Sequence, residues 1–284
     1  MSSTPLSYHT AKGVDAPSSA LKQVLVIAST PRTGSSLLCS MLRQTGEIGD
    51  AREHFHFSLV RQSEKETGHP RPTRKARARR VARRVVRKPS WEHADGFSPG
   101  EVRDYVAKLV RTHTGSSGVY SIKTHWNQYR RFILEAGLDE NVFGAPVTFV
   151  WLRRQDRVAQ ACSQVRAQQT GLWQEKGPGF GDGGEPRYDA EAITKYIGWM
   201  GSADKAWESY FSERNIEPLA LSYEEWSPQP ETAVDEIFGR LGMSRTNPVA
   251  VAIEKISDGV STEWARRFRT EFPDWADRIV RERQ

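Results

Sequence analysis

Short apolar runs alternate along this chain with longer segments in which apolar and polar residues mix. Four of the apolar runs, rich in β-branched or aromatic residues, predict buried strands at residues 23–30, 118–123, 145–152 and 217–222. Apolar residues recur at helical spacing in five segments, which predict helices at residues 35–45, 98–111, 156–169, 190–214 and 231–241. Strands that alternate with helices over this length predict an α/β fold, in which helices flank a central parallel sheet in three layers.

Two stretches lack this alternation. Residues 1–22 are rich in Ser, Thr and Ala and predict a flexible tail, so we expect one domain over residues 23–284. The stretch Lys176–Arg187 contains five Gly and two Pro, which predicts a loop, with a mobile lid as the alternative.

The composition excludes wholesale disorder. Hydrophobic residues make up 37% and aromatic residues 10% of the 284 positions, enough for a packed core. No apolar run approaches the length that spans a bilayer, and the first residues show no secretory signal. Because two cysteines, Cys39 and Cys162, are too few for a disulfide framework, we expect a protein of the reduced cytoplasm.

The positive charge is concentrated in one arginine-rich segment. Ten Lys or Arg and no acid lie from Arg71 to Lys88. The rest of the chain has 31 of the 41 basic residues and all 35 acidic residues, so its net charge is −4. Such a segment, within an insertion or lid at about residues 60–95, can contact nucleic acid or an anionic membrane surface. It can equally be a solvated helix or a flexible excursion. Because no aromatic residue interleaves with the arginines, we expect no nucleic-acid partner, while peripheral membrane contact stays open.

Residues 29–38 have the character of a phosphate loop. The first predicted strand runs into a short turn with Gly34 and hydroxyl side chains, and a helix follows. Amides at a helix N-terminus and the helix dipole favour an anion there, so the segment predicts a P-loop-like fold. It is not a Walker A loop, which needs a Gly at Ala28 and a Lys at Ser35, and Arg32 is the cation it offers instead. The alternative is a plain turn whose hydroxyls only cap the helix.

Glu53 follows this helix in the sequence Arg52-Glu53-His54-Phe55-His56. A carboxylate between two imidazoles is a candidate general base, and each imidazole is a rival for that role. A zinc site is not expected, because no third ligand lies nearby in the sequence.

A second anion site is predicted where the third strand ends, at Arg153 and Arg154. Adjacent residues of an extended chain point to opposite faces, so only one arginine can face a given phosphate. We favour Arg154 because it lies nearer the entry to the next helix. The alternative is that both arginines pair with surface carboxylates.

Five segments in chain order resemble the PAPS-dependent sulfotransferases, most closely the bacterial trehalose 2-sulfotransferase family, over about residues 23 to 270. They are residues 27–38, residues 49–55, Lys123 with residues 126–128, residues 153–163, and the C-terminal stretches 210–226 and 261–268. The chain departs from the family in its arginine-rich residues 60–95, in His54 and His56, and in residues 254–260. These departures lie near the acceptor side or the rim, so the acceptor's identity stays open.

The resemblance implies a sulfotransferase that uses PAPS (3′-phosphoadenylyl sulfate) as donor co-substrate. It implies that Glu53 is the base and that Arg32 and Lys123 stabilise charge on the leaving phosphate. The implied donor-binding residues are Arg32, Thr33, Gly34, Ser35, Ser36, Leu37, Arg154 and Ser163. No metal is required, because a sulfuryl group carries less charge than a phosphoryl group.

The implied acceptor is a carbohydrate or glycolipid, with trehalose the first candidate. Trp126, Trp173 and Trp199 are candidates for stacking on a sugar, with core packing as the alternative. A homodimer is compatible with the sequence. The competing functions are a P-loop kinase of small molecules, a basic nucleic-acid or membrane-surface binder, and a nucleotide-binding protein that has lost catalysis.

Overall fold

The computed structural model of the protein describes residues 20–56, 98–171, 185–250 and 259–273. Residues 1–19 of the predicted tail, the arginine-rich segment and most of the glycine-rich loop lie outside these residues. Contacts group the chain into two compact units, which are described separately. The sheet unit comprises residues 18–155 and 199–252, and the helical unit comprises residues 156–198 and 253–284 with the first 17 residues. The expectation of one domain stays a prediction.

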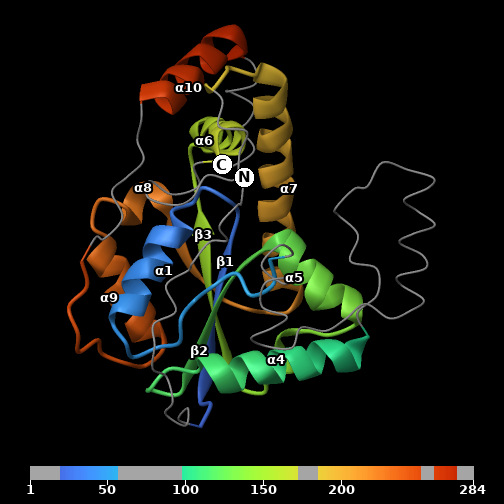
Figure 1. Cartoon of the computed structure of the whole chain (residues 1–284), viewed down its shortest axis with the longest axis vertical. Coiled ribbons are helices and arrows are strands. Elements are labelled where there is room, and N and C mark those ends of the chain that lie inside the picture. Colours follow the sequence, from blue (N-terminus) through green and yellow to red (C-terminus); the bar gives the residue numbers. More distant parts are fainter. Residues whose placement is uncertain (1–19, 57–97, 172–184, 251–258, 274–284) are drawn as a thin grey trace, which may run out of the picture. The chain divides into compact units, whose positions relative to one another are not determined.

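The sheet unit is built on four parallel strands in the order β2-β1-β3-β4 (Figure 1). The strands are β1 (Gln23–Ser29), β2 (Val119–His125), β3 (Val147–Arg153) and β4 (Leu219–Ser222), which confirms all four predicted strands. Ser29 lies opposite His125 on one side and Leu152 on the other, so the carboxyl ends of three strands lie level. The chain adds strands on opposite sides of β1, and such a switch point is where open α/β sheets bind ligands.

Helices cover both faces of the sheet because its side chains alternate between two apolar clusters. Val24, Val26 and Ala28 belong to one cluster, and Leu25 and Ile27 belong to the other. The first face packs against α4 (Pro99–His113), α5 (Trp126–Phe132) and the later part of α7 (Ala190–Glu213). The second face packs against α1 (Ser35–Gln44), α8 (Tyr223–Trp226) and α9 (Pro230–Arg240). The predicted α/β fold with a parallel sheet between helical layers is confirmed.

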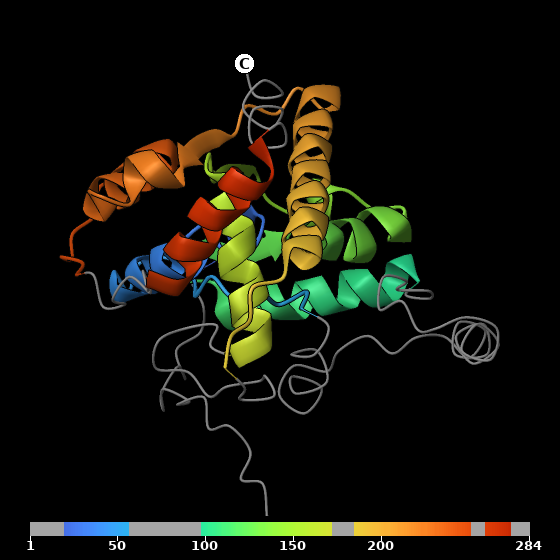
Figure 2. The ribbon, with the colours of Figure 1, turned by 90° about the horizontal axis from the view of Figure 1, so that it is seen from above.

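The helical unit has its own apolar core. Helix α6 (Arg157–Thr170) lies against α10 (Gly259–Glu271), as Figure 2 shows, and the first residues of α7 complete the cluster. Its buried side chains include Val158, Cys162, Ile197 and Phe268. Asp156 begins α6 by accepting a hydrogen bond from the Ala159 amide at 2.9 Å.

The hydrophobic pattern predicted the described helices α1, α4, α6, α7 and α9, and it missed α5, α8 and α10. Helix α4 begins with a capping box between Ser98 and Glu101, and at the start of α5 the Gln128 side chain accepts a hydrogen bond from the His125 amide at 3.0 Å. The pattern missed α5 because β2 runs into it without a turn residue. Two 3₁₀ turns, Leu134–Ala136 and Glu140–Phe143, lead from α5 to β3. Among the described helices, none is long and apolar enough to cross a membrane.

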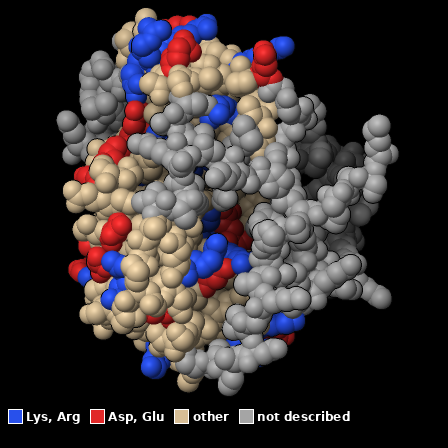
Figure 3. Space-filling model, turned by 60° about the vertical axis from the view of Figure 1, so that its left-hand side comes forward, with Lys and Arg blue, Asp and Glu red and all other residues tan. Residues whose placement is uncertain are grey.

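Charge on the described surface is of mixed sign. On the face drawn in Figure 3, Lys and Arg side chains lie beside Asp and Glu side chains. Among the described ion pairs, Arg245 pairs with Asp235 at 2.8 Å, and Arg267 pairs with Glu271 at 2.7 Å. Such exposed pairs stabilise a fold little, on the order of 0–1 kcal/mol each.

Candidate active site

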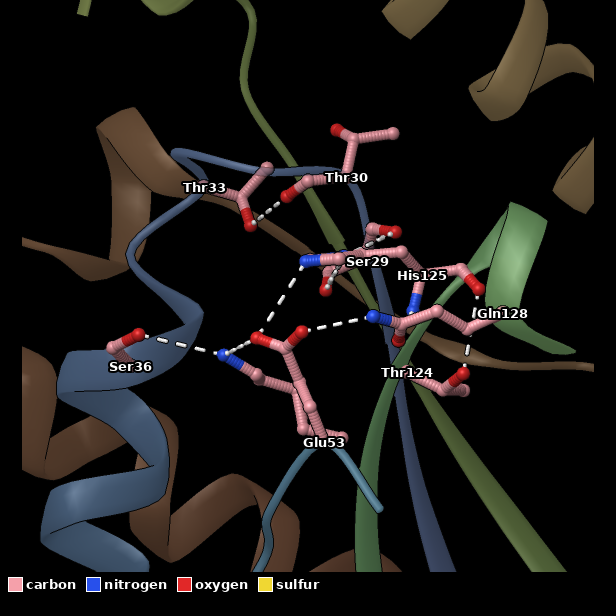
Figure 4. A network of polar contacts seen from close by, with 9 residues as sticks. Ser29, Thr30, Thr33, Ser36, Glu53, Thr124, His125 and Gln128 are labelled. Atoms are coloured by element: carbon pink, nitrogen blue, oxygen red, sulfur yellow. Dashed lines mark hydrogen bonds and ion pairs between the residues drawn. The ribbon is translucent and has the colours of Figure 1, made fainter. Parts of the chain in front are cut away.

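The phosphate loop leaves β1 at its carboxyl end and enters α1. Arg32 and Gly34 both adopt positive φ angles, 65° and 78°. A Cβ on Gly34 would lie 2.6 Å from the ring of Trp226 and 2.9 Å from that of Tyr223, so the turn requires glycine. Thr33 fixes the turn from inside, because its buried hydroxyl donates to the Thr30 carbonyl at 3.0 Å (Figure 4).

The N-terminus of α1 is open to an anion. Gly34 is the N-cap, no described side chain caps the helix, and the first turn holds no acid. First-turn amides have no partner within a helix, and the dipole makes this end positive. The predicted strand–turn–helix is therefore present. Phosphate binding by residues 32–37 stays a prediction.

Glu53 reaches the loop because residues 49–53 run beside β2. The Gly49 amide donates to the Val119 carbonyl at 2.9 Å, and the Lys123 amide donates to the Arg52 carbonyl at 3.1 Å. Arg52 and Ile122 form a parallel bridge. A Cβ on Gly49 would lie 2.3 Å from the His113 carbonyl oxygen, so only glycine allows this close approach.

The Glu53 carboxylate is held by two side chains (Figure 4). Lys123 Nζ lies 2.6 Å from Oε1, and Gln128 Nε2 donates to Oε2 at 2.9 Å. The Glu53 side chain is 20% exposed and that of Lys123 is 9% exposed. Burial raises the pKa of the Glu53 carboxyl, but the charges of Lys123 and His125 outweigh burial and hold that pKa far below its usual value. Glu53 is therefore a carboxylate at every ordinary pH.

Lys123 connects Glu53 to the phosphate loop. Its ammonium group also donates to Ser36 Oγ at 3.4 Å, in the first turn of α1. Burial lowers the pKa of Lys123, but the Glu53 charge and hydrogen bond raise it more, so the pKa lies above its usual value and the amine stays charged. Arg32 opposes this effect with its own positive charge. The structure thus brings Glu53, Lys123 and the start of α1 together.

His125 lies in the same network, and the sequence did not single it out. Its Nδ1 lies 3.1 Å from both the carbonyl oxygen and the hydroxyl of Ser29, and its Nε2 lies 3.7 Å from Glu53 Oε1. Burial, followed by the charge of Lys123, lowers the pKa of the imidazole below 6.5, although Glu53 acts in the opposite sense. A signal was available: His125 follows Lys123 by two positions in one strand, which places both side chains on the same face.

The two histidines that flank Glu53 in the sequence have other surroundings. His54 Nδ1 lies 3.0 Å from the Tyr120 hydroxyl, and its ring lies 4.7 Å from that of His113. Burial, with the nearby His113, lowers the pKa of His54 to about 3. The amide of His56 donates to the Glu53 carbonyl at 2.8 Å. His54 thus packs against Tyr120 and His113, and the alternative that His54 or His56 is the base stays a prediction.

Arg154 lies against the phosphate loop, while Arg153 does not. Arg154 Nη1 donates to the Arg32 carbonyl at 3.1 Å, and the guanidinium lies over the Tyr223 ring, 4.7 Å from its centre. Arg153 instead covers the Trp151 ring at 4.4 Å. Glu224 lies 4.0 Å from Arg154 Nε, at the limit of an ion pair. Binding of a 3′-phosphate by Arg154 stays a prediction.

The remaining predicted residues have simpler outcomes. Ser163 lies on α6 in the helical unit and is partly buried, and its role in donor binding stays a prediction. Trp126 packs edge-on against Trp207, 5.0 Å between ring centres, at the border of the core. Trp199 is partly buried on α7, and Trp173 lies outside the described residues. Within the described ranges, no three His, Cys, Asp or Glu side chains are grouped to hold a metal.

Comparison with known proteins gives a consistent result. Residues 24–271 match the family model described as Stf0 sulphotransferase. The trehalose 2-sulfotransferase of Mycolicibacterium smegmatis is 29% identical over 260 residues, which cover 86% of this chain and 93% of that protein. The trehalose 2-sulfotransferase of Mycobacterium tuberculosis is 28% identical over 273 residues, 90% of this chain and 97% of that protein. The crystal structure of sulfotransferase STF1 from M. tuberculosis aligns with 88% of this chain and with 77% of its own chain. The sequence identity is 13% and the TM-score is 0.42.

Proposed function

Because the chain belongs to the Stf0 sulfotransferase family, we propose that it moves the sulfuryl group of PAPS to a hydroxyl of trehalose or a related sugar or glycolipid. The observation that carries this proposal is the placement of Glu53. A charged carboxylate lies beside a buried Lys123, which itself contacts the first turn of the helix behind the phosphate loop. A base and a cation at an anion-binding helix end are the parts that sulfuryl transfer to a hydroxyl needs.

The donor would be held at its two ends by different residues. Amides from Arg32 to Leu37, at the uncapped start of α1, suit the 5′-phosphosulfate. Arg154 and Ser163 are the proposed partners of the 3′-phosphate. Arg154 already contacts the Arg32 carbonyl, so a phosphate that engaged its remaining donors would be tied to the loop.

Transfer would proceed in line, by analogy with phosphoryl transfer through a loose transition state. Glu53 accepts the proton of the acceptor hydroxyl while that oxygen forms a bond to sulfur. The bond between sulfur and the bridging phosphate oxygen breaks, and its electron pair stays on the phosphate. Lys123 and Arg32 stabilise that charge. Because Glu53 is held as a carboxylate, it is always ready to accept a proton, but its low pKa makes it a weak base.

The acceptor and the setting are also proposals. Both named relatives are trehalose 2-sulfotransferases, so trehalose is the first acceptor to test. The two cysteines in the chain, Cys39 and Cys162, are free and buried, which suits the reducing cytoplasm.

The test is incubation of the purified protein with sulfur-labelled PAPS and a panel of sugars, trehalose first. Release of PAP, the desulfated donor product, is measured together with labelled sugar, and Mg·ATP with the same sugars is the control for a kinase. Sulfated sugar formed at a rate that depends on the sugar supports the proposal. Phosphorylated sugar from Mg·ATP, or no labelled product with any sugar while PAP binds, would reject it.

A further inference from the structure

His125 lies beside Glu53, and the proposed mechanism gives it no role. Its imidazole lies between Ser29, at the end of β1, and the carboxylate of Glu53. The side chain is 12% exposed, so it is well shielded without being sealed. Figure 4 shows His125, Ser29 and Glu53 facing one another at the carboxyl ends of β1 and β2.

The contact with Ser29 assigns the tautomer of the imidazole. The Ser29 carbonyl oxygen, 3.1 Å from Nδ1, can only accept a hydrogen bond, so Nδ1 carries the hydrogen. The Ser29 hydroxyl oxygen at 3.1 Å can share the same donor. In the neutral ring Nε2 then carries a lone pair, and this atom faces Glu53 Oε1. At 3.7 Å the two atoms are too far apart for a hydrogen bond, so in this structure they share no proton.

The charges around the imidazole decide where a proton taken from an acceptor would rest. Lys123 and His56 disfavour a charge on His125, whereas Glu53 and the Ser29 carbonyl favour it. Burial is the largest effect, and together with Lys123 it outweighs Glu53, so the pKa of His125 lies below its usual value. The pKa of Glu53 is also held far below its usual value, because its carboxylate is the direct partner of Lys123. A proton on Glu53 would cost that ion pair, whereas Nε2 of the neighbouring ring offers a lone pair 3.7 Å away.

We propose that Glu53 and His125 form a proton relay, in which Glu53 takes the proton of the acceptor hydroxyl and His125 Nε2 receives it. The relay rests on the proposed sulfotransfer. The acceptor O–H bond breaks as the new O–S bond forms, and the proton passes through a Glu53 oxygen to Nε2. Glu53 is again a carboxylate and His125 is an imidazolium, which the facing carboxylate stabilises. The leaving phosphate oxygen keeps the electron pair of its broken bond to sulfur, and the imidazolium releases its proton to water before the next turnover.

Substitution by Asn separates the two nitrogens of His125. The Asn amide nitrogen takes the place of Nδ1 and can still donate to the Ser29 carbonyl, but nothing replaces Nε2. We expect His125→Asn to fold, to bind PAP as the wild type does, and to lower kcat by about 10²-fold, the lower range for a positioned proton acceptor. The matched control is His113→Asn, a histidine outside the network, which should stay within a few-fold of the wild type.

The pH profile gives a readout that a merely structural role would not change. The relay needs neutral His125, so wild-type kcat should fall as the pH drops through a value below 6.5. In His125→Asn this acid limb should move to lower pH, because only Glu53 remains. If His125→Asn keeps both the wild-type kcat and the wild-type acid limb, the relay is wrong and His125 only supports the loop.

A measurement without turnover separates failure of the relay from failure of the proposed function. Titration of His125 by NMR should show that Glu53→Gln lowers the pKa of His125, because Glu53 is the charge that raises it. An unchanged His125 titration in this variant rejects the relay, whatever the activity. If Glu53→Gln does lower the pKa of His125 but no sugar is sulfated, the proposed function is wrong. The catalytic relay then fails with it, and only the electrostatic contact between Glu53 and His125 remains.

Discussion

Glu53→Gln tests whether the ion pair with Lys123 holds the site together as well as serving the reaction. The substitution keeps the size of the side chain and removes its charge. Lys123, whose side chain is only 9% exposed, then keeps a positive charge with no carboxylate beside it. We expect the variant to be less stable than the wild type and much less active.

The magnitude follows from the geometry of the pair. Two unit charges at 2.6 Å attract by roughly 6 kcal/mol at an effective dielectric constant of about 20, and desolvation offsets part of this energy. Removal of one partner of a buried pair costs about 3–5 kcal/mol. Because 20% of the Glu53 side chain is exposed, the lower end applies. A loss of about 3 kcal/mol lowers the melting temperature of a chain of this size by roughly 6 °C.

A second variant distinguishes a loss of charge balance from a general disturbance. Glu53→Gln combined with Lys123→Met removes both charges, so it should recover most of the lost melting temperature. Its activity should stay as low as that of Glu53→Gln alone, at least about 10²-fold below the wild type, because the proposed base is still absent. Thermal unfolding followed by circular dichroism measures the first effect, and PAP release measures the second.

The pH dependence of the same difference has a fixed sign. The pKa of Glu53 is lower in the folded protein than its model value of 4.5, so its stabilisation is fully present above about pH 4.5 and is lost as the pH falls through the folded value. The gap in melting temperature between wild type and Glu53→Gln should be the same at pH 7 and pH 6, and should shrink in acid. A gap below about 1 °C at pH 7, or one that grows in acid, would contradict the ion pair.

Three further predictions concern the donor and its loop. PAP should raise the melting temperature more than ADP does at matched concentration, because a ligand that binds only the folded state stabilises it according to its affinity. Arg154→Ala should remove this difference between PAP and ADP, and equal shifts in the wild type would count against a 3′-phosphate site. Turnover should persist in excess EDTA, because Lys123 and Arg32 are the groups proposed to stabilise the charge on the leaving phosphate. Full loss of turnover that Mg²⁺ restores would favour the kinase alternative. Gly34→Ala should weaken PAP binding at least tenfold, because its Cβ would lie 2.6 Å from Trp226. Gly46→Ala is the control, because Gly46 has a similar positive φ of 67° but open space around it, and this variant should bind PAP normally.

The sequence determined the local elements of this protein. All four strands and the strand–turn–helix at residues 29–38 followed from apolar runs and from Gly34, because the spacing of neighbouring residues sets such features. The preference for Arg154 over Arg153 also came from local reasoning, because Arg154 lies nearer the entry to the next helix; its contact with a phosphate stays a prediction. The sequence pattern did not predict helix α5, because no turn residue marks its start after His125.

Only the tertiary structure decided which chemistry the network at Glu53 can perform. The sequence placed Glu53 between two histidines, yet its contacts are Lys123 and Gln128, about 70 positions away along the chain. Gly49 is the cause, because it lets residues 49–53 lie against β2 in the register that pairs Arg52 with Ile122. That register also brings His125, which the sequence did not single out, within 3.7 Å of Glu53. Strand register depends on contacts between distant segments, and the pattern of neighbouring residues in one sequence does not contain it.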